Sequence, residues 1–144
     1  MSNHVPADQP GTTSQQSDTR LLRRLHHVCI VVEDLEPAVA YFESLGVGPW
    51  YDYPHTSPYV ELDVPNVVAT KTMRYKCADF DNVQLQLCEP SSEPSPQRAF
   101  LDEKGPGVYH LGFLTDALLG DMEKAALLGL DRISYGIRED ESGF

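Results

Sequence analysis

Two histidines of this chain, His27 and His110, stand at equivalent positions of a repeated sequence pattern. Segments 27–32 and 110–115 align at one constant offset, and each histidine precedes a glycine, Gly46 or Gly129, by the same interval. The same offset superposes the apolar positions of a helical face: Leu35, Val39, Phe42 and Leu45 on Leu118, Met122, Ala125 and Leu128. Together, the histidine, the helical face and the terminating glycine indicate a duplicated βα unit.

A run of polar side chains accompanies the histidines. Gln84, Gln86 and Cys88 share one face of their predicted strand, opposite the apolar residues with which they alternate. This polar face indicates a water-filled cavity. Two neutral imidazoles and an amide or carboxylate oxygen can bind a divalent metal ion and leave positions open for substrate.

The alternative for each histidine is a hydrogen-bonded core or edge residue. For a single histidine we would favour that alternative, but equivalent positions in two copies favour the metal site. His26 is predicted to point to the face of the strand opposite His27, so we do not expect it to be a ligand.

The elements that must position these residues are two strand–helix units and the strands between them. Residues 25–32 predict a strand, and Asp34 caps a helix that ends at Gly46. Segments 108–114, 118–128 and 131–138 predict a second strand, helix and strand. Further strands are expected at 50–53, 59–64, 71–78 and 83–88, with a hairpin turn at 79–82, a polar linker at 89–96 and a helix at 97–104.

Length and composition exclude several classes of protein. The 144 residues, 41% of them hydrophobic, suit one domain, which we place at 21–144 after a disordered tail at 1–20. A net charge of −11 argues against nucleic acid and anionic membranes as partners. The sequence has no apolar run long enough to span a membrane and no secretory signal, and its three cysteines show no C-x-x-C spacing. These features predict a cytoplasmic protein with reduced thiols.

Several motifs resemble those of one family. The segment Leu25-His26-His27-Val28 resembles the first-strand motif of the vicinal oxygen chelate superfamily, and residues 107–113 resemble the first strand of its second module. This superfamily includes glyoxalase I, methylmalonyl-CoA epimerase, extradiol dioxygenases and bleomycin-resistance proteins. The segments 83–90 and 95–105 look most like those of the methylmalonyl-CoA epimerases.

The resemblance implies an α+β fold of paired βαβββ modules that form a half-barrel, with module one at about 24–90 and an incomplete module two at about 97–144. It implies one divalent metal ion held by His27, Gln86 and His110. The function it implies is that of a metal-dependent isomerase or lyase, epimerase-like or glyoxalase I-like, which stabilises an enolate or enediolate. The alternative is a non-catalytic protein of the same fold that binds a small molecule or sequesters an antibiotic.

Two departures from the family pattern leave the catalytic base unassigned. The fourth metal ligand of the family is a glutamate that also serves as a catalytic base in the epimerases. It would lie well beyond Phe144 if the interval from His27 to Gln86 is applied from His110. The other catalytic glutamate of the epimerases belongs on segment 70–77, which contains no carboxylate. The missing strands leave open sheet edges, so we expect either a homodimer or a chain completed by further residues.

Two substrate contacts are also expected. Arg74, with Lys71 and Lys76, could bind an anionic substrate such as an acyl-CoA, although a solvated strand face explains these charges as well. Trp50, with Tyr51, Tyr53 and His55, could line the mouth of a pocket, although packing of a hairpin explains these aromatic residues equally well.

Overall fold

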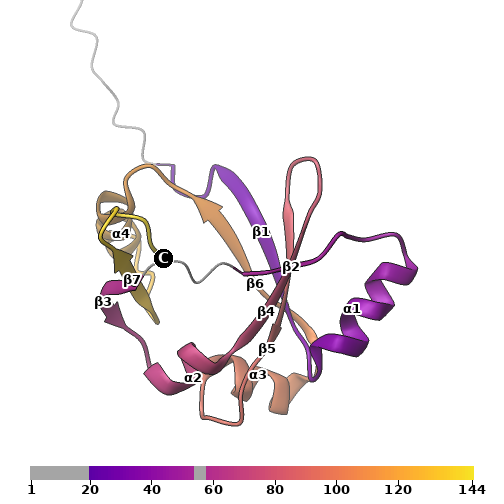
Figure 1. Ribbon diagram of the computed structural model, residues 1–144. Helices are drawn as coiled ribbons and strands as arrows, with labels where there is room; N and C mark the ends of the chain where they lie inside the picture. Colours follow the sequence, from indigo (N-terminus) through magenta and orange to yellow (C-terminus); the bar gives the residue numbers. More distant parts are fainter. Residues whose placement is uncertain (1–19, 54–57) are drawn as a thin grey trace, which may run out of the picture.

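The computed structural model describes residues 20–53 and 58–144, and its main feature is a five-stranded sheet (Figure 1). The strands stand in the order β2-β4-β5-β1-β6, with the bounds Tyr51–Asp52, Arg74–Asp79, Gln84–Glu89, Arg24–Val31 and Gly107–Leu114. β1 runs parallel to β5 and antiparallel to β6. The predicted α+β fold is therefore confirmed, and β1 is the strand that joins the two modules.

Helices cover both faces of this sheet. On one face α1 (Leu35–Ser44) packs through Leu35 against Leu87 of β5. On the other face α2 (Val67–Thr72) and α3 (Pro96–Lys104) contribute Ala69 and Leu101 to a buried cluster with Cys29 of β1. The cluster with Cys29 does not include His27 or His110 of the same sheet. Both histidines line the cavity described below.

The helix starts follow from their capping residues. The side chain of Asp34 accepts a hydrogen bond from the Glu36 N–H at the start of α1, as predicted. Ser95 caps α3 in the same way by accepting from the Arg98 N–H, and Pro96 occupies the first turn, where no backbone donor is needed.

The predicted strand at 71–78 is wrong in its first residues. Asn66 accepts a hydrogen bond from the Ala69 N–H and starts α2, so Lys71 and Thr72 are helical and β4 begins only at Arg74. The predicted hairpin turn at 79–82 is confirmed, because β4 and β5 pair antiparallel on either side of it.

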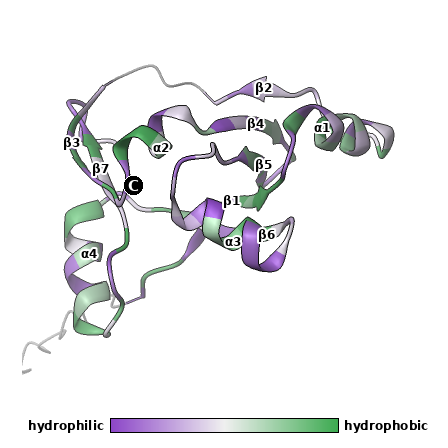
Figure 2. Cartoon of the chain, turned by 90° about the horizontal axis from the view of Figure 1, so that it is seen from below, coloured by the Kyte–Doolittle hydropathy of each residue, from purple (hydrophilic) through white to green (hydrophobic). Residues whose placement is uncertain are grey.

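A separate two-stranded sheet stands beside the main one. β3 (Tyr59–Asp63) pairs antiparallel with β7 (Tyr135–Arg138), and α4 (Leu118–Leu127) precedes β7. Figure 2 shows β3, β7 and α4 grouped on one side of the molecule, away from α1. By the offset of the sequence repeat, β7 of the second module corresponds to β2 of the first. However, β7 pairs with β3, a strand of the first module. The sequence pattern did not predict this pairing between modules.

Among the described residues no helix is long and apolar enough to cross a membrane. The predicted disordered tail lies almost entirely outside the described part of the chain, as does His55.

Candidate metal and substrate site

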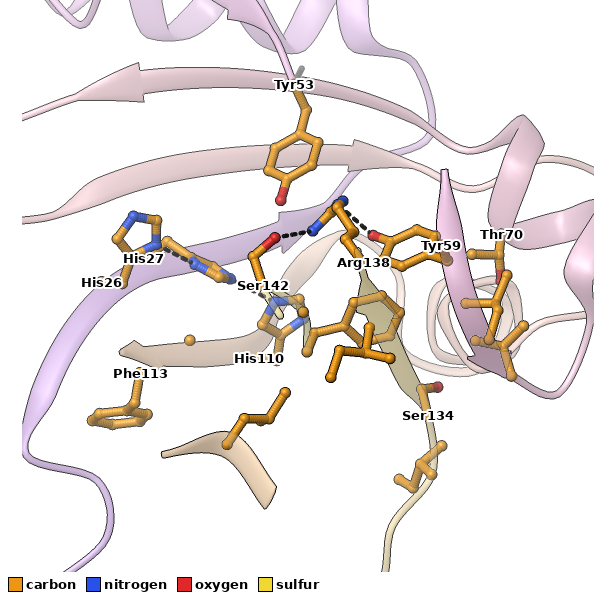
Figure 3. A pocket seen from close by; sticks show the side chains of 18 of the residues that line it. His26, His27, Tyr53, Tyr59, Thr70, His110, Phe113, Ser134, Arg138 and Ser142 are labelled. Carbon is orange, nitrogen blue, oxygen red and sulfur yellow. Dashed lines mark hydrogen bonds between the residues drawn. The ribbon is translucent and has the colours of Figure 1, made fainter. Parts of the chain in front are cut away.

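A cavity of about 1760 Å³ opens beside the exposed end of the main sheet. His26, His27, Gln86 and His110 line it from the main sheet, and Arg138 lines it from β7. Figure 3 shows the two histidine rings of β1 and the ring of His110 close together, with Arg138 and Ser142 nearby. Two of the three predicted metal ligands are thus in contact, and the third lines the same cavity.

The strand register brings His27 and His110 together. Cys29 of β1 lies opposite His110 of β6, and His27 lies two residues before Cys29 on the same strand face. The two rings meet nearly at right angles, with a centroid separation of 5.1 Å. Their Nε2 atoms are 2.9 Å apart.

Gly112 makes room for the His27 ring. It lies directly opposite His27 in the β1–β6 pair. A Cβ atom at this position would stand 2.0 Å from Cε1 and 2.4 Å from either nitrogen of the ring. The ring therefore lies flat over the backbone of β6, an approach that only glycine permits.

His26 does not point away from the site, and this prediction is wrong. The register of the β1–β6 pair shifts between Leu25 and His27, so the strict alternation of side chains is lost there. As a result the Nδ1 atom of His26 lies 2.9 Å from Nδ1 of His27. The three imidazoles form a chain, His26–His27–His110, in which both nitrogens of the middle ring are engaged.

Burial keeps the rings of His27 and His110 neutral. Desolvation, followed by the electrostatic influence of His110 and His26, lowers the pKa of His27 to about 4. Desolvation also lowers the pKa of His110. Neutral imidazole is the form that binds a metal ion, because the protonated ring has no free lone pair.

Gln86 is buried, with 4% of its surface exposed, and its orientation is determined by its neighbours. The carboxylate of Asp79 only accepts hydrogen bonds, so Gln84 must direct its NH₂ group to Asp79 Oδ1, at 3.0 Å. The oxygen of Gln84 then accepts from Nε2 of Gln86, at 2.6 Å. Within the described part of the chain, nothing donates a hydrogen bond to the side-chain oxygen of Gln86.

Tyr51 completes this network of polar side chains. Its hydroxyl donates to Asp79 at 2.9 Å and accepts from the amide of Gln84 at 2.8 Å. Sequence reasoning identified the polar face of β5 but missed the roles of Tyr51 and Asp79. They come from β2 and β4, and only the order of the strands shows that they meet β5.

The ligand atoms offered by His27, His110 and Gln86 fit a divalent cation. Two nitrogens that bind one ion at about 2.1 Å and at a right angle are about 3 Å apart, which agrees with the 2.9 Å between the Nε2 atoms. The free amide oxygen of Gln86 is an acceptable third ligand for such an ion. His27, His110 and Gln86 would therefore hold the ion.

A separate acidic cluster is already occupied by an arginine side chain. Asp34, Glu36 and Glu89 bring carboxylate oxygens within 4.8 Å of one another. Arg74 forms ion pairs with Glu36 and Glu89, and the Arg74 hydrogen bond is the main cause that lowers the pKa of Glu36 to about 2. The cluster is thus an ion-pair network.

The two residues predicted to contact substrate, Arg74 and Trp50, do not line the cavity. Arg74 belongs to the ion-pair network just described and does not line the cavity. Trp50 packs against Phe42 of α1 on the other face of the sheet, and its Nε1 donates to the carbonyl of Val47 at 3.2 Å. The polar tip of Trp50 is therefore used in holding the loop after α1. Of the predicted aromatic group, Tyr53 lines the cavity.

The fold and the site together define an α+β protein with a polar, histidine-bearing half-barrel. Residues 26–144 match the Glyoxalase/Bleomycin resistance protein/Dioxygenase superfamily. Because this match spans most of the chain, the protein belongs to that superfamily, and the resemblance of the sequence motifs is confirmed.

The chain is also similar in sequence to one individual protein. The uncharacterized protein YqjC of Bacillus subtilis is 30% identical over 97 residues, which cover 67% of this chain and 61% of YqjC. The chain thus spans less than two thirds of the length of that relative.

Solved structures share the fold. Methylmalonyl-CoA epimerase from Mycobacterium tuberculosis superposes with a TM-score of 0.61 at 24% identity, over 87% of this chain and 78% of that chain. A variant of the Streptomyces coelicolor methylmalonyl-CoA epimerase in complex with 2-nitronate-propionyl-CoA gives a TM-score of 0.56 at 20% identity, over 81% and 85%.

Proposed function

We propose that this protein is a metal-dependent isomerase or lyase that moves a proton next to a carbonyl group of a small-molecule substrate. The observation that carries the proposal is the arrangement of His27, His110 and Gln86, whose close Nε2 atoms and free amide oxygen suit one divalent cation once it replaces the proton between the rings. When bound, the ion would supply Lewis-acid chemistry that stabilises the enolate or enediolate charge. The similarity in fold to methylmalonyl-CoA epimerases supports an acyl-CoA or related substrate.

The chain's own residues orient this chemistry. His26 engages Nδ1 of His27 and so directs Nε2 toward His110. The Asp79–Gln84 pair holds the amide of Gln86 with its oxygen free. No catalytic base is assigned, since segment 70–77 contains no carboxylate.

The test is the metal content of the purified protein. We expect near-stoichiometric divalent metal in the wild type and its loss in the His27→Ala/His110→Ala variant, measured by elemental analysis. The loaded protein would then be assayed with 2-oxoaldehyde and acyl-CoA substrates. A wild-type protein that takes up no divalent metal, even after incubation with excess ion, would refute the proposal.

The second candidate is a non-catalytic protein that binds or sequesters a small molecule in the same cavity. The volume of about 1760 Å³ and the aromatic side chains of Tyr53, Tyr59 and Tyr109 in its wall favour it. Saturable ligand binding without turnover, unchanged when the metal is removed, distinguishes this function from catalysis.

Homodimer formation also remains a proposal. In the described part of the chain β6 pairs only with β1, so its outer edge is open, and Val108 and Leu111 beside it are more than half exposed. Such an edge can pair with a second copy. A mass of about one chain by light scattering at micromolar concentration would refute the dimer.

A further inference from the structure

Arg138 is a partly buried cation that faces the cavity. Its guanidinium carbon lies 4.3 Å from the centre of the Tyr59 ring, and Nη2 donates to the Tyr59 hydroxyl at 2.7 Å. Nη1 donates to the hydroxyl of Ser142 at 3.5 Å. Both partners are neutral, and they occupy two of the five donors of the group.

Several other arginines in the described part of the chain form ion pairs with carboxylates. Arg74 pairs with Glu36 and Glu89, Arg98 with Asp102, and Arg132 with Asp63. No carboxylate of the described residues lies within ion-pair distance of Arg138. Its acidic neighbour, Asp140, accepts hydrogen bonds from the backbone and hydroxyl of Ser142 instead. These bonds are the main cause that lowers the pKa of Asp140, and the charge of Arg138 adds a smaller effect.

Contact with the ring and the hydroxyl of Tyr59 also restrains the guanidinium group. A guanidinium held in this way loses little freedom when it binds, and its free N–H groups form a fork that suits two oxygens of one anion. The cavity wall thus holds an ordered fork of hydrogen-bond donors that no carboxylate of the described residues contacts.

We propose that Arg138 binds the carboxylate or phosphate group of a ligand in this cavity. Arg138 and His110 line the same cavity (Figure 3), so a ligand held by its anionic end at Arg138 can extend toward the histidines. Lys71 of α2 lines the same cavity and adds a second positive charge. Asp140 and Glu141 line it too, so recognition depends on direct contact with Arg138 and not on a positive field over the whole cavity.

This anion site replaces the sequence-based expectation that Arg74 meets an anionic substrate. It does not rest on the proposed metal, because none of the contacts of Arg138 involves His27, His110 or Gln86. The experiment therefore uses protein from which divalent ions have been removed with a chelator, and its outcome is independent of the metal test.

The probes are malonate for a carboxylate and inorganic phosphate for a phosphate group. Each is titrated into the full chain while the side-chain Nε–H signal of Arg138 is followed by NMR. We expect a saturable shift of this signal with at least one probe, and a loss of affinity of at least tenfold in Arg138→Gln. The probe that binds more tightly identifies the anion.

Two further variants make the test specific. Arg138→Lys keeps the charge but not the planar fork and should bind with intermediate affinity. Arg98→Gln removes a surface arginine that pairs with Asp102 on α3 and should bind as the wild type does. If Arg138→Gln fails to fold, the Arg138 signal in the wild-type titration decides the question alone. No saturable shift with either probe, or equal affinity in Arg138→Gln, overturns the proposal.

Discussion

Replacing Gly112 by alanine should disable the histidine pair without removing either histidine. The added Cβ would stand 2.0 Å from Cε1 of His27, whereas non-bonded carbon atoms keep about 3.5 Å or more. The ring must therefore retreat by about 1.5 Å. Its two nitrogens are each 2.9 Å from a neighbouring imidazole, His26 or His110, so a shift of this size breaks both contacts.

The magnitude follows from how closely a metal site must be held. Ligand positions that drift beyond about 0.5 Å lose productive geometry, and the ring displacement is several times larger. We expect Gly112→Ala to weaken metal binding at least as much as loss of a supporting contact does, by about 10- to 100-fold. The overpacked ring should also cost about 1–3 kcal/mol in the free energy of unfolding.

Calorimetric titration with a divalent ion and chemical unfolding measure the two effects. Gly120→Ala in α4 is the matched control, because no atom lies within 4 Å of a Cβ there, and it should leave metal affinity unchanged. In a His27→Ala background Gly112→Ala should cost almost nothing, since the clashing ring is gone. Wild-type metal affinity in Gly112→Ala, or the same unfolding cost with and without His27, would refute the reasoning.

Three further predictions concern the polar network and the histidines of the site. Asp79→Ala removes the acceptor that orients the amide of Gln84, so Gln84 and then Gln86 can turn, and metal affinity should fall about 10- to 100-fold in a competition titration with a chelator. His26→Ala should lower metal affinity, and His26→Asn should restore part of it; equal affinities of all three proteins would contradict the contact between His26 and His27. In metal-free protein His27 should titrate at about pH 4 by NMR. Because its folded pKa lies below the unfolded value of 6.5, this group's contribution to stability is complete above pH 6.5 and is lost as the pH falls toward 4.

Much of the fold could be predicted from the sequence, because its elements carry their own signals. Asp34 and Gly46 mark the ends of α1, and the turn at 79–82 lies between two apolar alternations. The pairing of β3 with β7 could not be predicted, because it joins segments far apart in the sequence and neither strand carries a pattern that specifies its partner. The start of α2 was missed because the capping role of Asn66 depends on one hydrogen bond in a segment otherwise typical of strands.

At the site, too, predictions could be made from local sequence patterns, whereas contacts between strands could not be predicted. The repeat identified His27 and His110, and the alternation on β5 identified Gln86. The role of His26 was mispredicted because a shift in strand register is a property of the pair of strands and not of either one. Arg138 was missed for a related reason: only the folded chain shows that this arginine, unlike Arg74, faces the cavity without a carboxylate in contact with it.

Why the repeat produces a site becomes clear from the register of β1 and β6. Val28 and Leu111 are equivalent positions of the two copies, and they also lie directly opposite each other in the antiparallel pair. A local twofold axis relating the two copies therefore passes between them. Residues one step before this point on each strand, His27 and His110, fall on either side of the axis and on the same face of the sheet. A duplicated strand that carries one histidine and pairs with its own copy in this register must bring the two imidazoles together, and a shift of the register by one residue would send them to opposite faces.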